Sequence, residues 1–296
     1  MGKQPDSLLN LSCTVQDCCC VQEEEAAAVG TLLRSSCPRL QVLRIEGKES
    51  GRMIVLPSFF VALSALDHGG YLQELHINKA LPAPVELVQS ISTLSVLALT
   101  LVLPFAHQGL HVAPLLRMTS LQRLSICEEQ YMSINGLEAV LCNLQQLTCL
   151  HVPDLSLEDV EALPKSLQLI HIHHSMEVDT IAALLSFAKS NPQTSITFRI
   201  LSLEHMTYET AHQLGCLFAD IVSASKEVVV RDVVSIKGSY ICNQIFGPVM
   251  GSYLARNVHY LDFESDSEII DIKASDMKLF AECCPNVQSE SIRLRL

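Results

Sequence analysis

A short apolar pattern recurs along this chain and constrains its fold more than any other feature. In residues 40–45, apolar side chains occupy the first, fourth and sixth places. Five further copies begin at Leu72, Leu94, Leu121, Leu147 and Leu167, so successive starts are 32, 22, 27, 26 and 20 residues apart. A looser copy occupies residues 258–263, and weaker ones lie at 195–200, 228–233 and 289–294. Self-similarity at such a spacing predicts a repeat architecture.

The segments between the copies have apolar residues about every three or four places, which is typical of helices. We expect helices in residues 57–66, 85–91, 136–147 and 179–188. Each unit is then a short strand, a turn and a helix, and only stacked units bury a continuous core. The inward positions predicted for that core are Leu43, Leu75, Leu97, Leu124, Leu150 and Ile170.

These copies resemble the leucine-rich repeat family, in the longer strand-plus-helix class that includes ribonuclease inhibitor and F-box adaptors. The resemblance is clear over residues 40–152, extends to Ile172 and fades after Asn191. It implies an α/β leucine-rich-repeat solenoid: a curved horseshoe with parallel strands on the concave face and helices on the convex face, irregular toward the C-terminus. The family's turn Asn or Cys is mostly missing, and the corresponding positions are Lys48, Ala80, Glu129 and Leu155. We therefore expect variable turns.

The repeat also defines the domain organisation. We expect an N-terminal cap in residues 1–39 and one solenoid in residues 40–296, with divergent repeats from about residue 191. Glu23, Glu24 and Glu25 favour the N-terminus of a helix that continues to Leu33. Longer helices are expected in residues 210–223 and 240–254. No long Pro-, Gly- or Ser-rich linker divides the chain.

Composition and motifs exclude several classes of function. The 296 residues carry 20 basic and 32 acidic side chains, a net charge of −12 that disfavours nucleic acid and anionic membranes as partners. The signatures of serine hydrolases, phosphate loops, dinucleotide folds and zinc proteases are missing, so we expect neither an enzyme nor a bound cofactor. The 12 cysteines include no C-x-x-C pair, and the N-terminus lacks a signal-peptide pattern. These features favour reduced thiols in the cytoplasm.

Candidate binding residues follow from the alternation of side chains along a strand. It aligns Arg44, His76, Ala98, Ser125, His151 and His171 in one exposed row. The next row contains Glu46, Asn78, Thr100, Cys127, Pro153 and His173. Because neighbouring strands lie about 4.8 Å apart, we expect three of the histidines to be close neighbours on the concave face. The predicted partner-binding residues are Arg44, His76, Arg123, Ser125, His151, His171 and His173.

The leading functional hypothesis is a monomeric, non-enzymatic module, or scaffold, that binds a protein partner on its concave face. It could also be the substrate-recognition half of an F-box-type ubiquitin-ligase adaptor without its F-box, because the residues before Leu40 show too little helical pattern for one. A pathogen effector or an axonemal scaffold would use the same repeats. A second class of function, a metal-dependent site formed by His151, His171 and His173, remains open, although the sequence shows no acidic or supporting partner for it.

Overall fold

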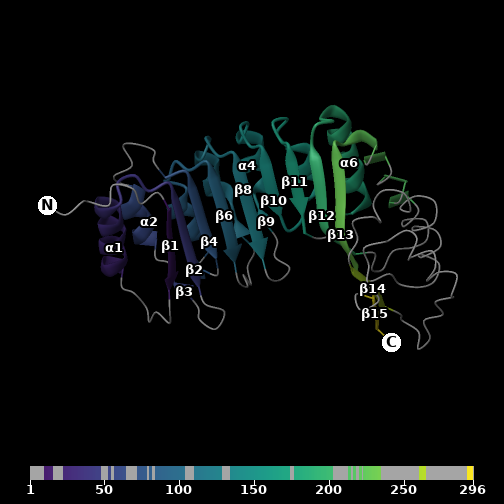
Figure 1. Cartoon of the computed structure of the whole chain (residues 1–296). Helices are drawn as coiled ribbons and strands as arrows, with labels where there is room; N and C mark the ends of the chain where they lie inside the picture. Colours follow the sequence, from purple (N-terminus) through teal and green to yellow (C-terminus); the bar gives the residue numbers. More distant parts are fainter. Residues whose placement is uncertain are drawn as a thin grey trace. The chain divides into compact units, whose positions relative to one another are not determined.

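The computed structural model describes a chain of alternating strands and helices that forms two compact units (Figure 1). Unit 1 contains Met1–Pro153 and Pro164–Ser166, and unit 2 contains Asp154–Leu163 and Leu167–Leu296. The residues described are 10–15, 23–47, 53–54, 57–64, 72–78, 80–81, 84–103, 110–128, 134–173, 177–202, 213–214, 216–217, 220–221, 223–234, 260–264 and 292–295. Among these, no helix is long and apolar enough to cross a bilayer.

Unit 1 is built on a parallel sheet in which the strand order is β1-β2-β4-β6-β8-β10. Its strands are β1 (Asn10–Val15), β2 (Val42–Gly47), β4 (Glu74–Asn78), β6 (Ala98–Leu103), β8 (Arg123–Glu128) and β10 (Cys149–Val152). Two short parallel pairs follow the main strands, β3 (Met53–Ile54) with β5 (Ala80–Leu81) and β7 (Leu110–His111) with β9 (Ile134–Asn135). Strands arranged in chain order and all parallel require a crossover between each pair.

Helices provide those crossovers. They are α1 (Glu23–Ser36), α2 (Pro57–Ser64), α3 (Pro84–Ile91), the 3₁₀ helix η1 (Ala113–Arg117) and α4 (Leu137–Asn143). The helices predicted at 23–33, 57–66, 85–91, 136–147 and 179–188 are confirmed, with ends that differ by a few residues, and η1 was not predicted. α1 packs against α2, and α2 against α3. A Cβ on Gly30 would lie 2.6 Å from the Phe59 carbonyl oxygen, so glycine there permits the close approach of α1 and α2.

The core of unit 1 is a row of leucines that crosses the sheet. Strand pairing aligns one leucine from each of five neighbouring strands, and all five are at most 1% exposed: Leu43, Leu75, Leu99, Leu124 and Leu150. A second row, which includes Ile45, Ile77, Leu101 and Ile126, is also buried. The apolar residues at the fourth and sixth places of each copy thus lie on the side of the strand that faces the core.

The third copy was predicted in the wrong frame. Leu97 is only half-buried, and Leu99 takes the core position opposite Leu75 and Leu124. Nearly every residue from 94 to 103 is apolar, so two frames that differ by two residues fit the pattern equally well. The copy begins at Val96, which lies 24 residues after Leu72 and 25 before Leu121. The corrected repeat is therefore more regular than the predicted one.

Backbone hydrogen bonds lock each repeat to the next. The Gln41 carbonyl accepts bonds from the amides of Gln73 and Glu74, at 2.8 and 2.9 Å. The Gln73, Leu97 and Gln122 carbonyls each accept the same pair of bonds from the following strand. Hydroxyl groups add side-chain links, because Thr148 donates to the Gln122 carbonyl at 3.1 Å and Ser166 to that of Leu147 at 2.7 Å.

Strand β1 was missed by the sequence analysis. It lies within the expected cap and pairs in parallel with β2, from Asn10 opposite Val42 to Val15 opposite Gly47. The sheet of unit 1 therefore begins one strand before the first copy that the sequence analysis identified. In the register of this pairing, Leu8, Leu11 and Cys13 occupy the first, fourth and sixth places, so the sequence contains a copy of the pattern that was overlooked.

Unit 2 continues the same construction by itself. Its parallel strands are β11 (Leu169–Ile172), β12 (Ser195–Ser202), β13 (Glu227–Val234), β14 (Tyr260–Glu264) and β15 (Ile292–Arg295), and its helices include α5 (Leu157–Glu161) and α6 (Val178–Ser190). The weak copies are confirmed as strands. The helix expected at 240–254 and much of that at 210–223 lie outside the described residues. Both units are α/β repeat solenoids in their strand order and connections.

Candidate functional site

The polar side of the unit 1 sheet is the candidate site, and we name it the open face. Its side chains alternate with the buried leucines, whereas the helices lie on the other side of the sheet (Figure 1). The first row contains Glu74, Ala98, Arg123 and Cys149; the second contains Arg44, His76, Thr100, Ser125 and His151; the third contains Asn78, Val102 and Cys127. These rows bring residues from 44 to 151 onto one surface.

Most predicted site residues of unit 1 share the row expected for them. Arg44, His76, Ser125 and His151 are aligned by strand pairing, and Arg123 lies one row earlier. Arg44 and Arg123 are exposed, and the other three are half-buried. Ala98 was assigned wrongly to the second row, where Thr100 lies, because of the same two-residue frame error.

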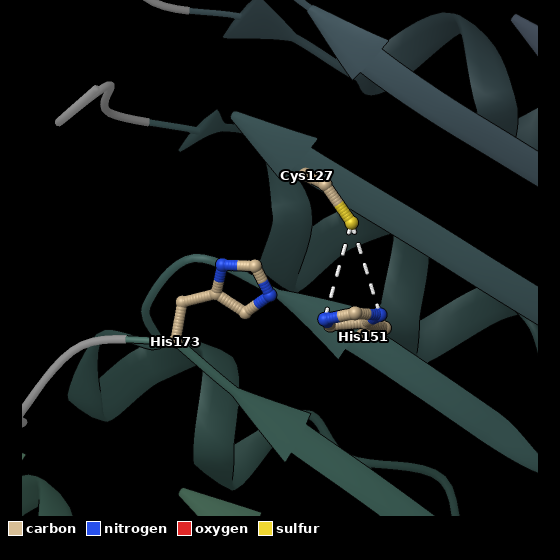
Figure 2. A group of neighbouring side chains, drawn as sticks. All are labelled: Cys127, His151 and His173. Carbon is tan, nitrogen blue, oxygen red and sulfur yellow. Dashed lines mark hydrogen bonds between the residues drawn. The ribbon is translucent and has the colours of Figure 1, made fainter. Parts of the chain in front are cut away.

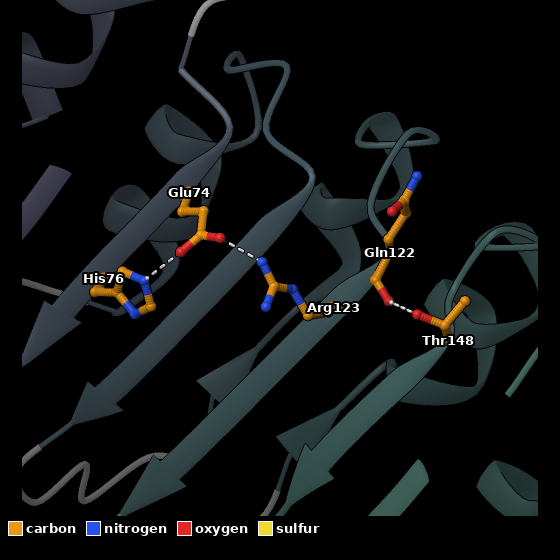
Figure 3. A network of polar contacts seen from close by, with 5 residues as sticks. All are labelled: Glu74, His76, Gln122, Arg123 and Thr148. Carbon is orange, nitrogen blue, oxygen red and sulfur yellow. Dashed lines mark hydrogen bonds and ion pairs between the residues drawn. The ribbon is translucent and has the colours of Figure 1, made fainter. Parts of the chain in front are cut away.

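A charged network crosses three strands of the open face (Figure 3). Arg123 of β8 forms an ion pair with Glu74 of β4, and the other carboxylate oxygen of Glu74 lies 3.3 Å from His76 Nε2. Ala98 of β6 lies between Glu74 and Arg123 in register and is 5% exposed. Two long side chains can meet across an intervening strand because the residue between them is small.

The network changes the acidity of Glu74. Partial burial of this carboxyl acts to raise its pKa, but the hydrogen bonds and positive charges of His76 and Arg123 outweigh burial, and the pKa is lowered. Glu74 therefore stays ionised and acts as an acceptor that holds Arg123 in place. The sequence analysis did not single out Glu74, although Glu74 and Arg123 both hold the third place of their copies and therefore share a row.

A thiol and an imidazole meet at the other end of the open face (Figure 2). Cys127 Sγ lies 3.8 Å from Nδ1 and 3.9 Å from Nε2 of His151. Ser125 Oγ lies 3.2 Å from the same Nδ1 and 3.4 Å from Cys127 Sγ. The sequence analysis placed Cys127 beside the His row without assigning it a role, so this pairing was missed.

Cys149 differs from this group. It is half-buried in the first row, and burial raises the pKa of its thiol while the Arg123 charge opposes the rise. The thiol of Cys149 is therefore protonated at neutral pH. Burial is sufficient to explain why the Cys149 thiol keeps its proton.

The remaining predicted residues lie in unit 2. His171 of β11 is half-buried and opposite Thr197 of β12. The prediction that His173 is exposed on a strand is wrong: β11 ends at Ile172, and His173 is only 5% exposed in the bend that follows. Strand alternation no longer determines its direction there. The His171 and His173 rings are tilted, with centroids 5.6 Å apart. His174 lies outside the described residues.

Comparisons with known proteins find solved structures with low sequence identity to this chain. No protein-family model and no curated protein matches the chain. A crystal structure of an internalin (inlF) from Listeria monocytogenes is 13% identical with a TM-score of 0.39, over 98% of this chain and 83% of the internalin. TLR13, in a complex with ssRNA13, is 13% identical with a TM-score of 0.36, over 88% of this chain and 40% of TLR13. The fold assignment rests on the strand pairing above.

Proposed function

We propose that the chain is a non-enzymatic interaction module that binds a protein partner through the open face of unit 1. The observation that carries the proposal is the aligned polar row from Arg44 to His151, which crosses the sheet from β2 to β10 on the side opposite the described helices. An extended sheet surface of this kind suits recognition of a macromolecule, because each repeat adds one position to the same row.

The charges of the open face indicate the chemistry of the partner. Arg44 and Arg123 are exposed although the chain carries a net charge of −12. Glu74 forms an ion pair with Arg123, so these two charges largely balance each other, but the Arg123 side chain is 56% exposed and can still contact a partner. An acidic segment of the partner would complement the two arginines, and electrostatic complementarity of this kind increases both association rate and specificity. A partner inside the cytoplasm, within a larger assembly, is part of this proposal.

The test compares two charge-reversal variants of the full chain. The first, Arg44→Glu with Arg123→Glu, changes the open face. The matched control, Arg39→Glu with Arg117→Glu, changes two exposed arginines in the turn before β2 and on η1. Partners captured by the wild-type chain are identified by mass spectrometry, and each is then purified for calorimetry.

A partner that uses the open face should bind the first variant at least about 10-fold more weakly, and the control with unchanged affinity. Circular dichroism of both variants establishes that they remain folded. If every purified partner binds the first variant as tightly as the wild-type chain, the interface lies elsewhere and the proposal is wrong.

A further inference from the structure

Two side chains that bind soft metals face one another on the open face. Cys127 lies on β8, two residues beyond Ser125, and His151 lies opposite Ser125 on the neighbouring strand β10. Side chains that are diagonal neighbours on one face of a sheet can reach one another when they are long enough. Here the sulfur lies 3.8 and 3.9 Å from the two ring nitrogens (Figure 2). Both residues are half-buried, so an ion from solvent can reach them.

The separation of these atoms matches the requirement of a tetrahedral metal. Zinc binds thiolate sulfur at about 2.3 Å and imidazole nitrogen at about 2.0–2.1 Å. At a tetrahedral angle, these bond lengths place the sulfur and the nitrogen about 3.6 Å apart. The observed distances exceed that value by a few tenths of an ångström. Because Sγ is almost equally far from both ring nitrogens, it does not lie along the lone pair of Nε2, and the His151 ring must rotate before Nε2 and Sγ can bind the same ion.

Ser125 determines which ring nitrogen is available. Its hydroxyl oxygen lies 3.2 Å from His151 Nδ1, within hydrogen-bonding distance. Histidine ligands of metals commonly engage their other ring nitrogen in such a bond, which fixes the tautomer and the orientation of the ring. When His151 Nδ1–H donates to Ser125 Oγ, the Nε2 atom carries the lone pair that can bind a metal, and it lies 3.9 Å from Cys127 Sγ.

We propose that Cys127 and His151 form a binding site for a soft divalent cation, with zinc as its expected occupant. The metal–sulfur bond forms as the thiol of Cys127 releases its proton to solvent, and neutral His151 binds through the lone pair of Nε2. A sulfur–nitrogen donor pair favours zinc over magnesium and calcium, which prefer oxygen ligands. The site needs no protein partner, so the result of its test does not depend on whether the proposed function is correct.

Cobalt titration of the full chain tests the ligands directly. Reduced, metal-free protein is titrated with Co²⁺, and the near-ultraviolet sulfur-to-cobalt absorption is followed. We expect the band in the wild-type chain and its loss in Cys127→Ser and in His151→Ala. Cys142→Ser is the matched control, because Cys142 is an exposed free thiol on α4, and it should leave the band unchanged. Ser125→Ala should weaken the affinity for Co²⁺ about 10-fold, as expected for a residue that orients the metal-binding histidine.

A second measurement uses the wild-type chain alone, so it does not depend on the folding of any variant. Iodoacetamide alkylates free thiols as the sulfur displaces iodide, and peptide mass spectrometry locates the modified cysteines. Zinc should slow the alkylation of Cys127 at least about 10-fold and leave that of Cys142 unchanged. The proposal is overturned if zinc does not protect Cys127, or if the cobalt band persists in a folded Cys127→Ser variant.

Discussion

The two faces of the unit 1 sheet differ in how much their residues vary from strand to strand. On the buried face, one aligned row of five neighbouring strands is leucine throughout, and the second row is also aliphatic. On the open face, the aligned second row changes from Arg44 through His76, Thr100 and Ser125 to His151. Close packing restricts the size and shape of buried side chains, whereas the open face has no such restriction. The repeat fixes where each open-face residue lies and leaves its chemistry free.

Strands β6 and β8 have similar core residues but different open-face residues. Both strands contribute two branched aliphatic residues to the core, Leu99 and Leu101 from β6 and Leu124 and Ile126 from β8. Their open-face residues differ: β6 has Ala98 and Val102 where β8 has Arg123 and Cys127. The charged network therefore spans β6, and the thiol–imidazole pair begins at β8. Equivalent core strands can thus have unrelated roles at the surface.

The largest effect is expected on the buried face. Leu124 is fully buried in the middle of the leucine row, so Leu124→Ala should lower the free energy of unfolding by about 2–5 kcal/mol. Urea denaturation followed by circular dichroism measures the loss. A loss below about 1 kcal/mol would show that the row does not form a packed core in solution.

A smaller effect separates the two possible frames of the third copy. Leu99 is 1% exposed and Leu97 is half-buried, so Leu99→Ala should cost about 2–5 kcal/mol and Leu97→Ala about half as much or less. The same urea experiment measures both variants, and each serves as the control for the other because the substitution is identical. Equal losses of stability, or a larger loss for Leu97→Ala, would contradict the assignment of Leu99 to the core and favour the original frame with Leu97 in that place.

The sequence predicts the core more completely than the open face for a physical reason. Burial repeats at every strand, so the pattern at Leu43, Leu75 and Leu124 is visible in one sequence. It becomes ambiguous only where both faces are apolar, as around Leu97. The repeat aligns Cys127 one row from His151, and Glu74 in the row of Arg123, but which of these side chains meet depends on their rotamers, which the pattern does not contain. His173 shows a further limit, because alternation ends where the strand ends.

The smallest effect concerns the pH dependence of the charged network. The pKa of Glu74 is lowered in the folded chain, so between the folded and unfolded pKa values the folded state binds fewer protons than the unfolded state. The stabilisation by Glu74 is therefore fully present above the ordinary glutamate pKa, about 4.3, and is lost as the pH falls through the lower folded pKa. Because Arg123 is largely exposed, solvent screens the ion pair, and we expect a contribution of about 0.2–1 kcal/mol.

Glu74→Gln should lower the free energy of unfolding by this amount at pH 7, and the difference from the wild-type chain should shrink as the pH falls below about 4.3. The measurement is urea denaturation between pH 7 and pH 3.5 at low salt, where surface ion pairs are least screened. In an Arg123→Ala background the effect of Glu74→Gln should be smaller, because the ion pair is already absent. An effect that is independent of pH and of Arg123 would assign the contribution of Glu74 to packing against Ala98, and the two long side chains would then stabilise the sheet by covering β6.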